Sequence, residues 1–112
     1  MEIREKIENK VNELVELELE RAKEKHGEKF NSKMEAYGVI KEEIEESREE
    51  VENLEVALNK FWRGIRGNDV DIKDIKVIKM YAMNLINESL QVAAMCDKYF
   101  ESFEEENKWK NY

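Results

Sequence analysis

The sequence contains no proline, only four glycines and a single cysteine among its 112 residues. The tight turns that join many short strands depend on proline and glycine, so their scarcity predicts a few long helices instead. Cys96 has no second cysteine with which to form an internal disulfide. The chain also lacks a cleavable hydrophobic leader after Met1 and any apolar run long enough to span a bilayer, which predicts a cytoplasmic protein without a membrane partner.

Basic residues are outnumbered by acidic ones, with 19 Lys and Arg against 27 Asp and Glu and a net charge of −8. Binding to nucleic-acid phosphates requires a basic face, so a nucleic-acid polymer is not an expected partner. A chain of this length is expected to fold as one domain that buries roughly two-thirds of its unfolded surface.

Three stretches repeat apolar residues at helical spacing. The first runs from Ile3 to about Lys25 and ends near Gly27. The second begins at Asn31 or Ser32, where Ser32 and Glu35 have the spacing of a capping box. The loop at 64–69 separates it from a third stretch, which continues to about residue 104.

This pattern predicts an all-α fold. A long antiparallel helical hairpin is expected over residues 30–104, preceded by a helix within 1–29 and followed by a tail at 105–112 in which Trp109 and Tyr112 could dock. Two helices leave one apolar side that needs cover from the first helix or from another subunit. A homodimer with a four-helix core is expected, and a homotetramer could be built from the same hairpin.

Acidic residues follow one edge of both hairpin helices. At about 100° per residue, Glu43, Glu46 and Glu50 form a ridge beside the apolar stripe of the second helix. Glu88 and Gln91 occupy equivalent angles on the third helix. Carboxylates three residues apart can share Mg²⁺, which prefers oxygen ligands and is often completed by substrate phosphates. In a chain this acidic, a solvated charged face explains the same residues without any function.

The run Glu35-Ala-Tyr-Gly-Val-Ile-Lys-Glu-Glu-Ile-Glu-Glu46, with Glu88-Ser-Leu-Gln-Val-Ala-Ala-Met95 downstream, resembles the MazG-like branch of the all-α nucleoside triphosphate pyrophosphatases. The similarity is greatest to short members that are common in phage and prophage. It covers about residues 30–103. The resemblance implies Mg²⁺-dependent hydrolysis of a nucleoside or deoxynucleoside triphosphate to the monophosphate and pyrophosphate.

The family motif Glu-Glu-x-x-Glu is matched by Glu42, Glu43 and Glu46, and its second motif, Glu-x-x-Asp, reads Glu88-x-x-Gln91 here. By resemblance, Glu43, Glu46 and Glu88 bind Mg²⁺, and Gln91 is a weak or indirect ligand. Glu42 is implied to orient ligands or the attacking water. An amide oxygen in place of a carboxylate brings no charge, so metal binding is expected to be weaker than in the family.

Several other residues have possible functional roles, but ordinary packing and solvation would explain their presence equally well. Trp62 could stack on a base, Lys79 could meet phosphates beside other basic residues, and Asn84 could contact a nucleotide. Solvated helix ends and ordinary packing account for the same side chains. Cys96 lies on the apolar stripe and is expected to be buried.

Two alternatives to an enzyme remain open. The chain could be a non-catalytic helical interaction protein that has kept the fold. The replacement of the family's Asp by Gln91 in the second motif favours this alternative. It could also be a sensor that binds a nucleotide without cleaving it.

Overall fold

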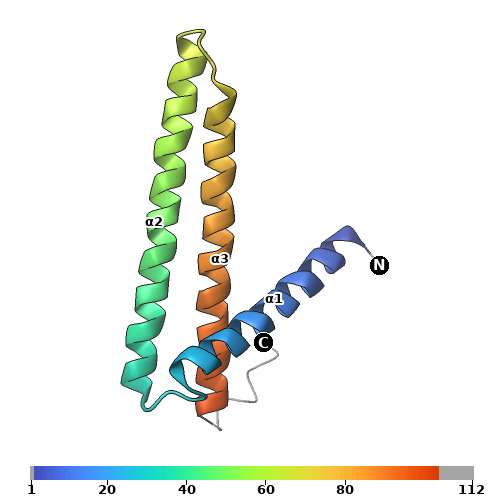
Figure 1. Ribbon diagram of the computed structural model, residues 1–112, viewed down its shortest axis with the longest axis vertical. Coiled ribbons are helices and arrows are strands. Elements are labelled where there is room, and N and C mark those ends of the chain that lie inside the picture. The colour runs from blue at the N-terminus through green and yellow to red at the C-terminus, as the bar shows by residue number, and fades with distance from the viewer. Residues whose placement is uncertain (1, 104–112) are drawn as a thin grey trace. The chain divides into compact units, whose positions relative to one another are not determined.

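The computed structural model describes residues 2–103, which form three α-helices and no strand (Figure 1). Helix α1 spans Ile3–His26, α2 spans Lys33–Arg66 and α3 spans Ile72–Ser102. The all-α prediction is confirmed, and each predicted helix is present. The tail with Trp109 and Tyr112 lies outside the described residues.

The start of α2 shows how closely the local sequence determines a helix end. The backbone N–H of Glu35 donates to Ser32 Oγ at 3.0 Å, which is half of the predicted capping box. The other half differs, because the Glu35 carboxylate accepts from the backbone N–H of Asn31 at 3.0 Å and from its side-chain amide at 3.1 Å. These bonds lower the pKa of Glu35, with the Asn31 backbone bond the largest cause.

The connection between α2 and α3 is short and held by backbone hydrogen bonds. The N–H of Asp69 donates to the carbonyl of Gly64 at 2.8 Å. A Cβ atom on Gly64 would lie 3.0 Å from the Asp69 carbonyl oxygen and would push the loop away by a few tenths of an ångström, so this close approach favours glycine. Asp71 directly precedes helix α3, and its side chain accepts from the N–H of Lys73 at 2.9 Å, as an N-cap residue does.

The described chain divides into two compact units, residues 2–43 with 90–103 and residues 44–89. In the first unit, α1, the start of α2 and the end of α3 share a core. Its buried side chains are mostly small or flexible, and Ala94 is fully inaccessible. The core consists of Leu19, Ala22, Phe30, Ala36, Ala94 and Met95.

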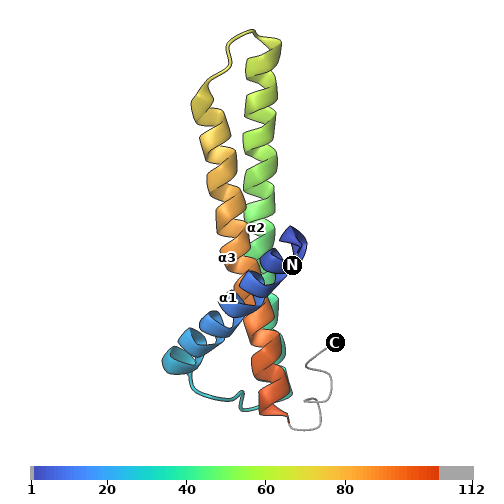
Figure 2. The same cartoon turned by 90° about the vertical axis from the view of Figure 1, so that its right-hand side faces the viewer.

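The second unit consists of two antiparallel helical segments, which lie side by side in both ribbon views (Figures 1 and 2). Lys60 on α2 pairs with the buried Asp74 on α3 at 3.6 Å. This pair marks the register of the two segments. The predicted hairpin is therefore present, whereas its completion by dimerisation is a separate question.

Candidate metal centre

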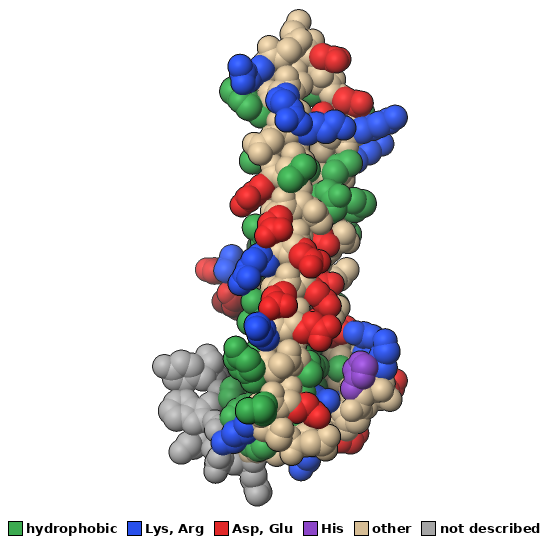
Figure 3. Space-filling model, turned by 90° about the vertical axis from the view of Figure 1, so that its left-hand side faces the viewer, with side chains coloured by type: hydrophobic (Ala, Val, Ile, Leu, Met, Phe, Trp, Pro, Cys, Tyr) green, Lys and Arg blue, Asp and Glu red, His purple; other side chains and the backbone are tan. Residues whose placement is uncertain are grey.

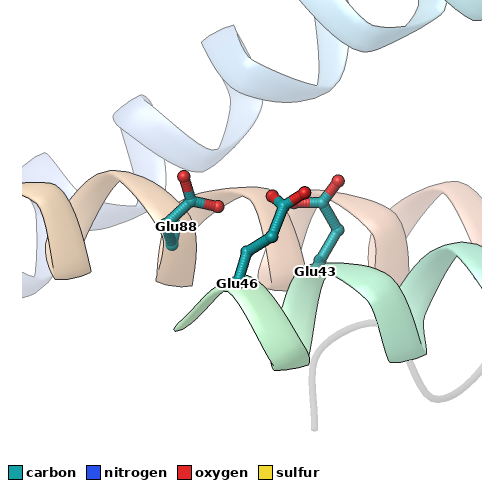
Figure 4. Close-up of side chains that lie close together, drawn as sticks. All are labelled: Glu43, Glu46 and Glu88. Carbon is teal, nitrogen blue, oxygen red and sulfur yellow. The ribbon is translucent and has the colours of Figure 1, made fainter. Parts of the chain in front are cut away.

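Three carboxylates converge near the middle of α2 and α3. Glu43 and Glu46 stand one turn apart on α2, and Glu88 projects from α3 toward the same point (Figure 4). One oxygen from each side chain lies within 4.8 Å of those of the other two, and all three residues are half-buried. The sequence predicted these three residues as the metal ligands, and the structure brings them together.

The antiparallel register explains why they meet. Fourteen residues separate Glu46 from Lys60, and fourteen also separate Asp74 from Glu88. Fourteen residues are almost four full turns of helix, so an alignment that pairs Lys60 with Asp74 also sets Glu46 level with Glu88 on the same side. Glu43 then follows from Glu46 by one turn of the same unbroken helix.

Glu50 extends the acidic edge by one further turn of α2. Its Oε2 atom is shielded from solvent and accepts no hydrogen bond among the described residues. A buried carboxylate oxygen without a donor is unfavourable unless a cation compensates it. The sequence placed Glu50 on the acidic ridge, but the predicted ligand set omitted it.

Arg21 of α1 is a second residue that the sequence analysis missed. Its Nε donates to Glu18 at 3.0 Å, and this hydrogen bond and the charge of Glu18 are the main reasons that the pKa of Arg21 is raised. The charge of Glu43 raises it further. Only the packing of α1 beside the start of α2, through Leu19 and Ala22, brings this guanidinium toward Glu43. No spacing within the sequence could have shown this.

The remaining predicted residues are placed less centrally. Glu42 is exposed and does not belong to the converging set. Gln91 lies one turn after Glu88 on α3, and Asn84 one turn before it, and both are half-buried. They remain candidates to complete the site from the same helix.

The structure does not bring Trp62 or Lys79 to the carboxylates. Lys79 is exposed and precedes Glu88 by nine residues, which places the two on opposite sides of α3. Trp62 is 54% exposed and lies sixteen residues beyond Glu46, roughly 24 Å along the helix axis. A base or phosphate held by the carboxylates would not reach either residue in this chain.

The geometry of the three carboxylates suits a divalent cation. Oxygens on opposite sides of a bound Mg²⁺ are about 4.2 Å apart, since each lies about 2.1 Å from the ion. Oxygens at adjacent positions are about 3.0 Å apart, and three ligands can include only one opposite pair, so separations of up to 4.8 Å would need to close by up to about 2 Å. Glutamate side chains can move that far by small torsional changes, so the residues present fit the ion.

No known family model matches the chain, and no curated protein or solved structure matches it either. The MazG-like resemblance therefore depends on the motif residues themselves. Among the described helices, none has an apolar stretch long enough to cross a bilayer.

Proposed function

We propose that this protein is a Mg²⁺-dependent hydrolase that converts a nucleoside or deoxynucleoside triphosphate to the monophosphate and pyrophosphate. The observation that carries the proposal is the convergence of Glu43, Glu46 and Glu88, on two helices, within 4.8 Å. Like charges repel, so the convergence of three half-buried carboxylates supports a cation site over a solvated acidic face. The Glu42-Glu43-x-x-Glu46 motif supplies the reaction class by resemblance.

In this proposal Glu43, Glu46 and Glu88 hold the metal, and Glu42 orients the attacking water from the exposed edge. When bound, Mg²⁺ offsets phosphate charge and lowers the pKa of a coordinated water. Glu50 contributes its shielded oxygen to the same acidic edge, either to a ligand directly or through water. Gln91 contributes at most a neutral oxygen, so the two motifs hold four acidic residues here where the family has five.

We also propose that the working protein is a homo-oligomer. Many large apolar side chains of the described chain are exposed, including Ile7 at 53%, Leu58 at 57% and Ile86 at 55%. A single copy therefore leaves much of its apolar surface in water.

Turnover tests the chemical proposal. The purified protein should release pyrophosphate from at least one of the eight common nucleoside and deoxynucleoside triphosphates in the presence of Mg²⁺, and EDTA should abolish the release. Glu46→Gln should lower kcat/KM by at least about tenfold, since loss of even a residue that supports a metal ligand commonly costs about 10–100-fold. Glu49→Gln is the matched control, because Glu49 is exposed on the same helix and outside the converging set. Absence of pyrophosphate with every triphosphate would overturn the enzyme proposal.

The second candidate function is a nucleotide sensor. Gln91 favours it, because Gln91 lacks the negative charge of the family's Asp and therefore weakens metal binding at the site. A ligand at 100 times its Kd stabilises a folded protein by about 2.7 kcal/mol. A rise in Tm with triphosphate and Mg²⁺ together, without pyrophosphate release, would identify the sensor. A non-catalytic interaction protein would show neither effect.

A further inference from the structure

A triphosphate bound at the three carboxylates brings more negative charge than one Mg²⁺ offsets. Enzymes that act on such substrates commonly offset the rest with Arg or Lys side chains that contact phosphate oxygens. The sequence suggested Lys79 for this role, but Lys79 lies on the side of α3 opposite Glu88. Another basic residue is needed beside the carboxylates.

The basic residues of α2 do not meet this need. On the face of the molecule in Figure 3, Asp and Glu side chains predominate along the middle of the hairpin, whereas Lys and Arg side chains gather near the loop. Lys41 and Arg48 are the basic residues of α2 nearest in sequence, two residues before Glu43 and two after Glu46. Two residues correspond to about 200° around a helix, so both project from the other side of α2.

Helix α1 and Glu43 belong to the same unit, and their packing brings α1 beside this carboxylate. Ala22 of α1 and Val39 of α2 pack in one core. Glu18 lies one turn before Ala22, and Glu43 lies one turn after Val39. Each step leads away from the α1–α2 connection along the side of the helix that carries the core contact. Glu18 and Glu43 therefore lie on the facing sides of α1 and α2, just beyond the core.

The guanidinium of Arg21 lies near both of these carboxylates. Its Nε donates to the two carboxylate oxygens of Glu18 at 3.0 and 3.1 Å, and its Nη2 donates to Oε1 of the same residue. The hydrogen bond and charge of Glu18 are the main causes of the raised pKa of Arg21, and the charge of Glu43 adds to them. The Arg21 side chain is nevertheless 54% exposed, so a ligand can reach it.

The hydrogen bonds to Glu18 leave one edge of the guanidinium open. A guanidinium has two edges with paired N–H groups, and each can bind a carboxylate or a phosphate through two parallel hydrogen bonds. Glu18 occupies the edge formed by Nε and Nη2. Within residues 2–103, Nη1 of Arg21 donates no hydrogen bond, so the edge formed by Nη1 and Nη2 is available to a ligand.

We propose that Arg21 binds a phosphate group of the triphosphate through its Nη1–Nη2 edge while Glu18 holds the other edge. Because the ion pair with Glu18 already restricts the long side chain, less conformational entropy is lost when the phosphate binds. The carboxylates then hold the metal, and α1 supplies a positive charge to the phosphates. This inference rests on the triphosphate binding of the proposed function and not on hydrolysis.

Two arginines on α1 form a matched pair for the test. Arg4 donates from Nε to Glu8 at 3.1 Å, so it has the same kind of ion pair as Arg21, but it lies near the other end of the helix. The probe is the α,β-methylene analogue of the triphosphate that raises Tm most with Mg²⁺. In isothermal titration calorimetry, Arg21→Gln should bind this analogue about 10–100-fold more weakly than the wild type, as loss of a charged hydrogen-bonding group predicts. Arg4→Gln should bind it as the wild type does.

A titration with Mg²⁺ alone separates a phosphate contact from a structural role. Arg21→Gln removes a positive charge near Glu43, so its affinity for Mg²⁺ should be unchanged or higher. If Arg21 only supported the fold of the site, the variant would bind Mg²⁺ and the analogue more weakly together. Arg21→Lys should recover part of the affinity for the analogue, because lysine keeps the charge but lacks the bidentate edge.

Phosphate binding by Arg21 and hydrolysis can fail separately. Analogue binding that depends on Arg21, without pyrophosphate release from any triphosphate, would support this inference and contradict the hydrolase. Pyrophosphate release with equal analogue affinity in the wild type and Arg21→Gln would refute the role of Arg21 and leave the hydrolase intact. If no triphosphate raises the Tm of the wild type and no analogue binds it in the presence of Mg²⁺, both proposals fail.

Discussion

The hydroxyl of Ser102, at the end of α3, accepts a hydrogen bond of 2.8 Å from the backbone N–H of Phe30. The same hydroxyl donates to the carbonyl of Lys98 at 2.6 Å. Phe30 lies in the connection between α1 and α2, its side chain is buried, and the Lys98 ammonium lies 4.6 Å from its ring centroid. One serine therefore joins the α1–α2 connection to the last turn of α3 within the first unit.

Ser102→Ala should destabilise the protein by about 1–3 kcal/mol, because the partly buried N–H of Phe30 loses its acceptor. Urea unfolding followed by circular dichroism measures the change. Ser89→Ala is the matched control, since Ser89 is an exposed serine within the same helix. Equal midpoints for the two variants would show that the hydrogen bond contributes nothing to stability.

The helices and most of their ends could be predicted from the sequence, because these features depend on neighbouring residues. Ser32 and Glu35 satisfy amides within one turn, and Gly27 ends α1 with a φ of 96°, which favours glycine. The acidic site could also be predicted in part. Helical spacing placed Glu43 and Glu46 on one edge, and the hairpin register brought Glu88 beside them.

Features that depend on the packing of distant segments could not be predicted. Cys96 continues the apolar period of α3 and was expected to be buried, but this prediction is wrong, because the thiol is exposed. In the first unit the core uses another side of α3, where Ala94, Met95 and Lys98 are buried. The spacing of apolar residues in the sequence identifies an apolar stripe on a helix. It does not show which side of that helix the neighbouring segments cover.

Glu46→Gln should have opposite effects with and without metal. Without divalent cations, removing one of three converging negative charges should raise stability by a few tenths of a kcal/mol to about 1 kcal/mol. With Mg²⁺ in excess, the rise in Tm that the wild type shows should be smaller in the variant, because a ligand is lost. Thermal unfolding with EDTA and with Mg²⁺ measures both.

Glu49→Gln provides the reference for this measurement, since its carboxylate lies outside the converging set. It should keep the Mg²⁺-dependent rise in Tm of the wild type. If Mg²⁺ moves the Tm of the wild type and of Glu46→Gln equally, the three carboxylates do not form the binding site.

The capping carboxylate of Glu35 should make stability depend on pH. Hydrogen bonds from Asn31 lower its pKa below the ordinary value of 4.5, so the unfolded chain takes up the proton first as pH falls. The stabilisation is fully present above pH 4.5 and is lost as pH falls through the lower pKa of the folded state. Glu35→Gln should therefore lower Tm at pH 7 and have progressively less effect below pH 4.5.

Thermal unfolding of the wild type and Glu35→Gln between pH 7 and pH 2.5 would show this convergence. Glu24→Gln, on the exposed surface of α1, should show no such pH-dependent difference. A constant gap between the wild type and Glu35→Gln across the range would contradict the capping role of the charge.

Cys96 should react with a thiol reagent in the folded protein, because its side chain is exposed. Its reaction should nevertheless be slow near neutral pH. Although the side chain is exposed, the surrounding protein displaces part of its water, and this desolvation raises the pKa of the thiol above its ordinary value of 9.0; the negative charge of Asp97 raises it further. Since the thiolate is the reactive form, the labelling rate should keep increasing above pH 9.

Asp97→Asn should accelerate labelling at pH 8 by less than tenfold, because Asp97 is the smaller of the two causes. Labelling rates with Ellman's reagent, compared with those of the urea-unfolded chain, measure each effect. If the thiol reacts only after unfolding, Cys96 is buried, as the apolar spacing along α3 predicted, and the exposed position is wrong.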